Sequence, residues 1–237
     1  MLNLLTTVKD SLQRRGIAAT LRAIFNHIFY YFVAYRDQQF DRKHGTDSGG
    51  IIQLDLLTVT GGNIEHGRYH QAIWVKWFRR AMEHIRADFE NFVFIDYGCG
   101  KGRALLLATD HPFKKIIGIE FAREFCVLAE QNIEIFLKQT GRPNNTEIMW
   151  TDAETYSLPD EDTVIFFYNP FAEEVMVKVL NKIEESLNKC PRKIFVIYAY
   201  PLLADLFKAS GYLKEIYAMK GDVRLKLGCR IYTNVLS

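Results

Sequence analysis

The stretch that most constrains this chain of 237 residues runs from Phe92 to Ala108. It begins with an apolar, β-favouring run, passes Asp96 and three alternating glycines, and restarts as an apolar run suited to a helix. Glycine lets backbone N–H groups approach a ligand closely, and a helix N-terminus presents such groups in a cluster. The stretch therefore predicts a strand, a nucleotide-binding loop and a helix, the first unit of an open α/β sheet.

Two common nucleotide loops do not fit. The dinucleotide fingerprint Gly-x-Gly-x-x-Gly needs a glycine where this chain has Arg103, and the Gly-Lys-Ser/Thr ending of a phosphate-binding P-loop is absent. What remains is Asp-x-Gly-x-Gly-x-Gly, in which the early acid suits a ligand with an amino group and positive charge better than a pyrophosphate. In this pattern the chain resembles class I S-adenosylmethionine (SAM)-dependent methyltransferases.

The resemblance implies SAM as the cofactor and a Rossmann-like, seven-stranded class I methyltransferase sheet of α/β class, with an N-terminal helical extension. Glu120 ends the next apolar run, about 20 residues after the loop, where an acid can accept both ribose hydroxyls. Asp152 and Ala153 follow the third run, where the family uses an acid for the adenine amino group; a helix N-cap is the alternative for Asp152. The expected cofactor-binding residues in the loop are Asp96, Gly98, Cys99, Gly100 and Gly102, with Cys99 as a space-filling thiol rather than a nucleophile.

The chain is expected to divide into an N-terminal helical extension that covers the site, residues 1–90, and a SAM-binding domain, residues 91–237. From residue 92 onwards, apolar β-type runs alternate regularly with helical patterns. The expected strands end near Asp96, Glu120 and Trp150 and then cover 163–168 and 193–200, with long helices over about 124–140 and 172–188. Two last runs, 213–218 and 229–235, predict a hairpin that matches the antiparallel seventh strand of the methyltransferase sheet.

Residues 1–36 have apolar positions at helical spacing, and 23–35 form an uncharged, aromatic-rich run. This run is shorter than the ~20 residues that a membrane-spanning helix needs. We expect it to pack on the domain or on a partner; peripheral contact with a membrane surface is the alternative.

Composition narrows the class of partner. With 30 basic and 28 acidic residues, the chain has no overall field that would draw it to nucleic acid, so such a partner is disfavoured without being excluded. The four cysteines lack the spacing of metal ligands, and no metal is expected. Free thiols and the lack of a signal-like start favour a cytoplasmic protein.

Two polar segments before the glycine loop are candidates for substrate binding. Residues 40–50, with Thr46 and Asp47, resemble a segment found ahead of the loop in many bacterial methyltransferases, and by that resemblance they should fold over the cofactor and acceptor site. A capped turn is the alternative. Tyr69 occupies a position that in the same group lies close to the methionine end of SAM, and His70 beside it is either a base or a helix-capping residue.

The run 163–168 leads directly into Asn169, Pro170 and Phe171, and ligands of open α/β sheets bind at the carboxyl ends of strands. This tripeptide resembles the Asn/Asp-Pro-Pro-Tyr/Phe motif of adenine-N6 and glutamine methyltransferases, with one proline missing. The resemblance implies that Asn169 accepts the N–H bonds of a planar amino or amide group while Phe171 packs against it. The alternative is that Asn169-Pro170 only ends a strand and begins a helix.

These patterns favour a SAM-dependent methyltransferase that methylates nitrogen in a protein or peptide side chain, an amide or an amine. Asn169, Pro170, Phe171 and Tyr69 would orient the acceptor. Three alternatives stay open: a small-molecule methyltransferase of secondary metabolism, a nucleic-acid base methyltransferase, and a SAM-fold protein that only scaffolds a partner.

Overall fold

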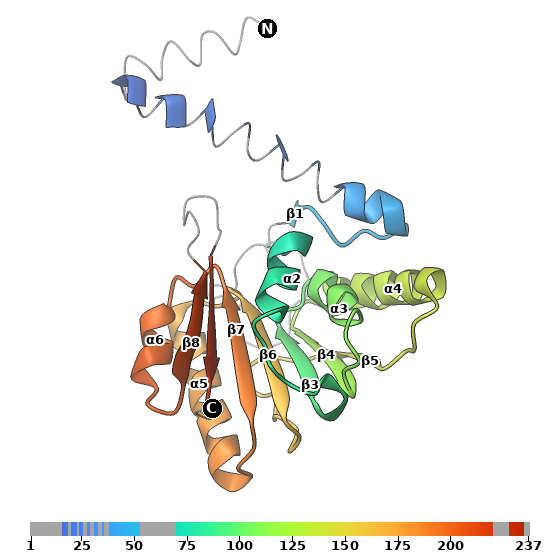
Figure 1. The fold of residues 1–237 in the computed structure, drawn as a ribbon. Coiled ribbons are helices and arrows are strands. Elements are labelled where there is room, and N and C mark those ends of the chain that lie inside the picture. The colour runs from blue at the N-terminus through green and yellow to red at the C-terminus, as the bar shows by residue number, and fades with distance from the viewer. Residues whose placement is uncertain are drawn as a thin grey trace, which may run out of the picture.

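The computed structural model describes residues 38–52, 70–219 and 228–234, together with single positions and short runs between 16 and 35. Its main feature is a seven-stranded sheet flanked by helices (Figure 1). The strands are β3 (Val93–Tyr97), β4 (Lys115–Glu120), β5 (Thr146–Trp150), β6 (Thr163–Tyr168), β7 (Ile194–Ala199), β8 (Lys214–Met219) and β9 (Cys229–Thr233). The helices are α2 (Val75–Met82), α3 (Arg103–Ala108), α4 (Arg123–Thr140), α5 (Glu173–Lys189) and α6 (Ala204–Ala209).

The strand order is β5-β4-β3-β6-β7-β9-β8. The first five strands in this order pair in parallel, whereas β9 lies antiparallel between β7 and β8. The predicted seven-stranded Rossmann-like α/β sheet with an antiparallel C-terminal hairpin is thus confirmed. The order also brings the carboxyl ends of β5, β4, β3 and β6 together along one edge of the sheet.

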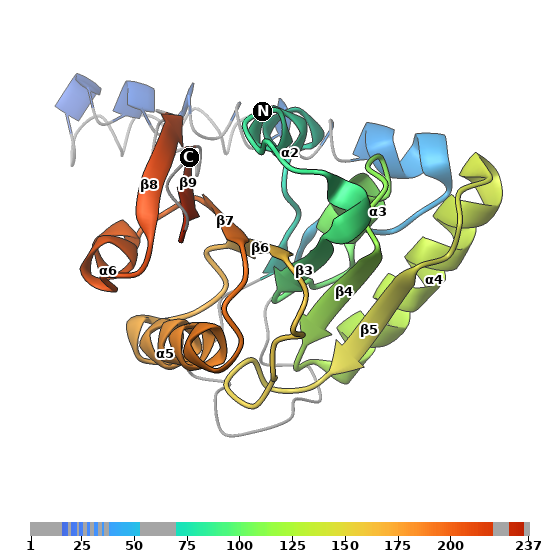
Figure 2. The same cartoon turned by 60° about the horizontal axis from the view of Figure 1, so that its bottom comes forward.

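Helices cover both faces of the sheet, with α2, α3 and α4 on one face and α5 and α6 on the other (Figure 2). The central strands β3, β6 and β7 are therefore buried on both sides, which is why they read as continuous apolar runs rather than as alternating ones. Successive residues of a strand still separate by face: Phe94 and Phe166 pack under α2, while Ile95 and Phe167 pack against α5 and α6.

Three short elements were not predicted. Residues Ile51–Ile52 (β1) pair antiparallel with His70–Gln71 (β2), and a 3₁₀ turn at Phe89–Asn91 precedes β3. Two-residue strands are too short to show an alternating pattern in a sequence. The proposed division at residue 90 stays a prediction.

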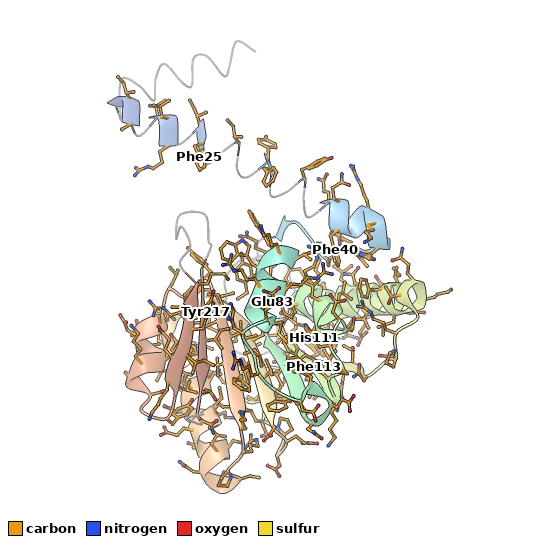
Figure 3. All side chains as sticks on the ribbon, in the orientation of Figure 1. Phe25, Phe40, Glu83, His111, Phe113 and Tyr217 are labelled. Carbon is orange, nitrogen blue, oxygen red and sulfur yellow. The ribbon has the colours of Figure 1, made fainter. Side chains whose placement is uncertain are left out.

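The N-terminal apolar stripe does not pack on the domain in the part that the structure describes. Ile17, Leu21, Phe25, Ile28 and Tyr35 all have more than half of their surface exposed. Phe25 lies away from the sheet, whereas Phe40 lies close to α3 and α4 (Figure 3). No described helix is long and apolar enough to cross a membrane. These described side chains therefore do not pack on the domain, and packing on a partner stays a prediction.

Gly118 in the middle of β4 explains how closely α3 approaches the sheet. A Cβ atom at this position would lie 2.6 Å from Leu105 Cδ1, 2.8 Å from Cys99 Sγ and 3.0 Å from Ile148 Cδ1. Gly118 pairs with Asp96 of β3, so any shift that made room for a side chain would be transmitted to the strand that carries the glycine loop.

We expect Gly118→Ala to lower the free energy of unfolding by about 1–3 kcal/mol, because overpacking forces the Leu105 and Cys99 side chains aside. Urea denaturation measures the loss. Gly141→Ala is the comparison: a Cβ there would meet no atom within 4 Å, so it reports only the strain of a backbone with φ of 68°. An unchanged midpoint for Gly118→Ala would contradict the packing described here.

Candidate functional site

The glycine loop leaves the carboxyl end of β3 and turns directly into α3. Gly98, Gly100 and Gly102 have φ angles of 76°, 52° and 86°, a left-handed conformation that residues with a Cβ rarely adopt. The amides of Gly98 and Cys99 both donate to the carbonyl of Ile119 in β4, at 2.9 and 3.0 Å. These two hydrogen bonds hold the loop against the neighbouring strand β4 without help from a ligand.

Two of these glycines also have no room for a side chain. A Cβ on Gly98 would lie 2.7 Å from Cβ of Pro170, and a Cβ on Gly102 would lie 3.2 Å from Cβ of Ala129 in α4. The first contact places the segment after β6 directly against the loop. Residues 98 and 170, which the sequence suggested for cofactor and acceptor respectively, therefore meet.

Cys99 lies inside the loop and is buried. Burial, followed by the negative charges of Glu120 and Asp96, raises the pKa of its thiol well above the usual value. A thiol that stays protonated is a poor nucleophile, so the geometry supports its interpretation as a space-filling residue.

Glu120, at the end of β4, is buried and braces the loop through its carboxylate. Oε2 accepts the N–H of Gly100 at 2.8 Å, and Oε1 accepts the N–H groups of Phe121 and Ala122 at 3.0 and 2.9 Å. A carboxylate has about four lone-pair sites, so the three bonds leave room for one further donor on Oε2. In this arrangement Glu120 can accept one ribose hydroxyl, and a second would have to share a site with the loop amide.

Asp96 and Glu120 lie on adjacent strands and are both buried. Burial raises the pKa of Asp96 well above its ordinary value, and the charge of Glu120 adds to this effect. Burial also raises the pKa of Glu120 to about 7, against the opposing effect of its three backbone hydrogen bonds. A ligand that donates hydrogen bonds to these carboxyl groups would favour their ionised forms.

Asp152 follows β5 at the same edge of the sheet. Its Oδ1 accepts the N–H of Glu154 at 2.9 Å, and its carbonyl accepts the N–H of Thr155 at 3.0 Å. Asp152 therefore lies in a local turn and not at the N-cap of a helix, which was the alternative that the sequence offered, and Ala153 beside it is buried. The three acids Asp96, Glu120 and Asp152 thus end three neighbouring parallel strands, β3, β4 and β5.

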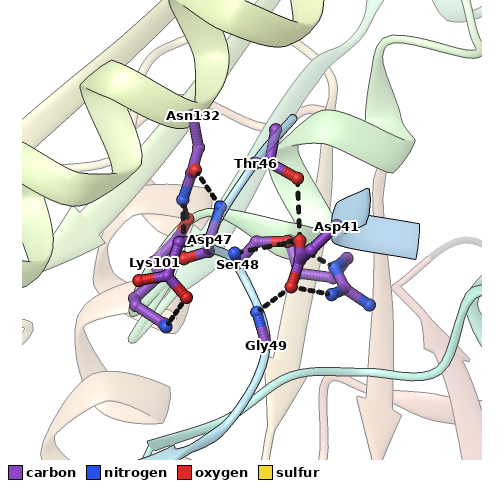
Figure 4. A network of polar contacts seen from close by, with 8 residues as sticks. Asp41, Thr46, Asp47, Ser48, Gly49, Lys101 and Asn132 are labelled. Atoms are coloured by element: carbon purple, nitrogen blue, oxygen red, sulfur yellow. Dashed lines mark hydrogen bonds and ion pairs between the residues drawn. The ribbon is translucent and has the colours of Figure 1, made fainter. Parts of the chain in front are cut away.

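An ion pair between Asp41 and the buried Arg103 holds residues 41–49 against the start of α3. Arg103 is 2% exposed and donates to Asp41 Oδ2 at 3.2 Å and to Ser48 Oγ at 2.6 Å. The Asp41 carboxylate also accepts bonds from the Thr46 hydroxyl and from the amides of Ser48 and Gly49 (Figure 4). Burial alone would raise the pKa of Asp41, but Arg103 and these hydrogen bonds outweigh it and lower the pKa.

Asp47 joins the same segment to the loop at a second point. Its carboxylate pairs with Lys101 Nζ at 2.7 Å, and its backbone is held from both sides by the Asn132 amide of α4 (Figure 4). The Asp47 side chain is nevertheless 72% exposed, while that of Lys101 is 3% exposed. The segment therefore presents a carboxylate to solvent beside the glycine loop, whereas the Thr46 hydroxyl is used inside the turn.

Asn169 follows β6 in a left-handed conformation with φ of 44°. It is buried, and its Oδ1 accepts a hydrogen bond from the Tyr198 hydroxyl of β7 at 2.9 Å. The ring centroids of Phe171 and Phe167 lie 6.4 Å apart, in an edge-to-face arrangement. The tripeptide thus has a fixed geometry at the carboxyl edge of the sheet.

Two predicted site residues are not placed as fully. Tyr69 lies outside the described residues, so its role stays a prediction. His70 pairs through its backbone with Ile52 in the small β1–β2 sheet. That pairing brings the chain before α2 next to the end of the 40–50 segment.

Sequence reasoning missed Asp41, Lys101, Arg103, Asn132 and Tyr198. In the sequence analysis Arg103 served only to exclude the dinucleotide fingerprint. A basic residue at the start of an otherwise apolar helix also indicates that the side chain is buried with a partner of opposite charge. The partner, 62 positions earlier, leaves no local signal. Across the described part of the chain, no group of His, Cys, Asp or Glu side chains could hold a metal ion.

No protein-family model and no curated protein matches the chain. Solved structures with a similar fold include a SAM-dependent methyltransferase from Aquifex aeolicus, with 14% identity, coverage of 66% of this chain and 88% of that chain, and a TM-score of 0.48. A ribosomal protein L11 methylase from Lactobacillus delbrueckii subsp. bulgaricus has 13% identity, 67% and 76% coverage and a TM-score of 0.47. An RNA methyltransferase from Salinibacter ruber in complex with S-adenosylhomocysteine has 16% identity, 66% and 87% coverage and a TM-score of 0.41.

We expect Asp41→Ala to lower the free energy of unfolding by roughly 1–3 kcal/mol, because it removes a carboxylate that pairs with the buried guanidinium of Arg103 and accepts the amides of Ser48 and Gly49. Denaturation in urea measures the loss. Asp205→Ala is the matched control, since the exposed Asp205 forms a long ion pair with Lys208 at 3.9 Å. It should leave the midpoint unchanged. Equal effects of the two substitutions would show that the 41–49 segment is not docked as described.

The raised pKa of Glu120 predicts how stability depends on pH. The folded state holds a proton up to about pH 7, whereas the unfolded state loses it near the ordinary value of 4.5. The preference of the folded state for the protonated Glu120 therefore adds to the free energy of unfolding. The addition is fully present below pH 4.5 and is lost as pH rises through 7, by up to roughly 3 kcal/mol. Urea midpoints measured across this range should fall with pH, and the fall should be smaller in Glu120→Gln. A rise with pH in the wild type would contradict the assignment.

Proposed function

We propose that this protein is a SAM-dependent methyltransferase. The observation that carries the proposal is the joint arrangement at one edge of the sheet: a glycine loop in left-handed conformation, and acids at the ends of three adjacent parallel strands. Open α/β sheets bind ligands at this edge. A ligand with a ribose, an amino group and a positive charge fits acids at these places.

The residues proposed to hold the cofactor are Asp96, Gly98, Cys99, Gly100, Gly102, Glu120, Asp152, Ala153 and Asn169. Glu120 has one lone-pair site left for a ribose hydroxyl. The loop glycines leave the backbone accessible where side chains would fill the space. When bound, the cofactor supplies a methyl group on a positively charged sulfur, so the buried acids and the exposed carboxylate of Asp47 surround it with complementary charge.

For the acceptor, we propose nitrogen in a protein or peptide side chain, oriented by Asn169, Pro170, Phe171 and Tyr69. The contact of Pro170 with Gly98 supports this, because it joins the acceptor segment to the cofactor loop. Thr46, Asp47, Tyr69 and His70 would contact the substrate. Methylation of nitrogen releases a proton, and the exposed Asp47 carboxylate is a described group that can receive it.

A small-molecule acceptor stays the alternative, because residues 53–69, which belong to the segment expected to cover its pocket, lie outside the described residues. A location in the cytoplasm is part of the same proposal.

Calorimetric titration with S-adenosylhomocysteine tests the cofactor assignment, with NADH as the control ligand. We expect binding of the first with a dissociation constant in the micromolar range, or about −8 kcal/mol, and none of the second. Asp96→Ala should weaken the binding at least about tenfold, because it removes a carboxylate that accepts charged or polar donors. Asn169→Ala should leave it nearly unchanged while methyl transfer from labelled SAM is lost, because the proposal assigns the backbone of Asn169 to the cofactor and its side chain to the acceptor. Absence of binding in the wild-type protein would refute the proposal.

A further inference from the structure

The side-chain amide of Asn169 contains a buried donor without an acceptor. Asn169 is 3% exposed, yet its Nδ2 has no hydrogen-bond partner among the residues that the structure describes. Leaving a buried donor unsatisfied forfeits its hydration without replacement, so such groups are rare in folded proteins. A donor retained in this state calls for a ligand that supplies the acceptor.

The neighbouring residues fix which end of the amide is free. The backbone N–H of Leu203 donates to the Tyr198 hydroxyl at 3.2 Å, and that hydroxyl donates in turn to Asn169 Oδ1 at 2.9 Å. These two hydrogen bonds follow one another, and the second of them ends on the Asn169 amide oxygen. In this orientation Oδ1 accepts the tyrosine proton, and the NH₂ group is the end that has no acceptor among the described residues.

The free donor lies at the cofactor edge of the sheet. Asn169 adopts a φ of 44°, and Tyr200, just after the next strand, adopts a φ of 50°. Non-glycine residues held in this conformation gather at functional sites. Pro170 packs against Gly98, the first glycine of the loop. The amide is therefore held in a fixed place one residue from the contact between the acceptor segment and the loop.

We infer that Asn169 acts towards the methyl-accepting molecule as a hydrogen-bond donor, and that this molecule carries a carbonyl or carboxylate oxygen beside the methylated atom. The inference rests on the proposed methyltransferase function and narrows its substrate class. Carboxamide and carboxylate groups offer the required lone pair, whereas an aliphatic ammonium group has only N–H donors and would face the amide donor. It also reverses the hydrogen-bond role that the sequence resemblance implied for this side chain, which was to accept N–H bonds.

The test follows the Asn169 side-chain NH₂ signal by ¹⁵N NMR in the complex with S-adenosylhomocysteine, the signal being assigned by its loss in Asn169→Ala. Acetamide, acetate and methylammonium are the probes, added to millimolar concentrations. We expect acetamide and acetate to shift the signal saturably and methylammonium to leave it unchanged.

Asn169→Asp keeps an acceptor for Tyr198 but cannot donate when ionised. It should weaken acetate binding at least about tenfold, as expected for one charge-assisted hydrogen bond. Asn144→Asp adds the same charge on an exposed loop and should bind acetate like the wild type. If Asn169→Asp does not fold, the wild-type titrations decide alone.

Three results would overturn the inference. Methylammonium could shift the signal instead of the oxygen-bearing probes, or none of the probes could shift it. S-adenosylhomocysteine alone could form the hydrogen bond, which would assign the donor to the cofactor. Failure of S-adenosylhomocysteine to bind is a separate result, because it would refute the proposed function itself and this inference with it.

Discussion

The buried guanidinium of Arg103 is the constraint on which the glycine-loop edge of the sheet depends. A fixed positive charge at the start of α3 must be neutralised inside the protein, and Asp41, more than fifty residues before the first strand of the sheet, pairs with it. The same carboxylate closes the turn of residues 46–49, and Phe40 lies over the guanidinium, with its ring centroid 4.2 Å from Cζ. This ion pair therefore holds the glycine loop and the segment that borders it together.

At the strand ends, by contrast with the Arg103–Asp41 ion pair, two acids lie buried on adjacent strands. These acids are Asp96 and Glu120, and burial raises the pKa of both. Such a pair is a cost to the folded protein without a ligand, and a ligand that donates hydrogen bonds or carries positive charge would relieve it. Binding sites often keep groups that destabilise the folded protein because ligand binding needs them. Stability and ligand affinity should accordingly change in opposite directions on neutralising substitutions here.

The sheet could be predicted from the sequence because its signals are local. Strands buried on both faces give unbroken apolar runs, as in Val93–Tyr97, and the glycines and acids that end them lie next to those runs. The ties between Asp41 and Arg103 and between Asp47 and Asn132 could not be predicted, because each joins positions more than sixty residues apart. Resemblance led us to expect residues 40–50 over the cofactor and acceptor site, and the structure adds that Thr46 serves the turn while Asp47 stays exposed.

Asn169 shows most clearly what a short motif leaves open. A tripeptide specifies that an amide stands after β6, but the direction of its hydrogen bonds depends on Tyr198, 29 positions later in β7. The tyrosine hydroxyl donates its proton to the asparagine oxygen, and the NH₂ group has no partner among the described residues. The hydrogen-bond role of an amide, which can donate or accept, thus depends on its neighbour on the adjacent strand. In our proposal the chemistry of the acceptor molecule follows from that arrangement rather than from the identity of residue 169 alone.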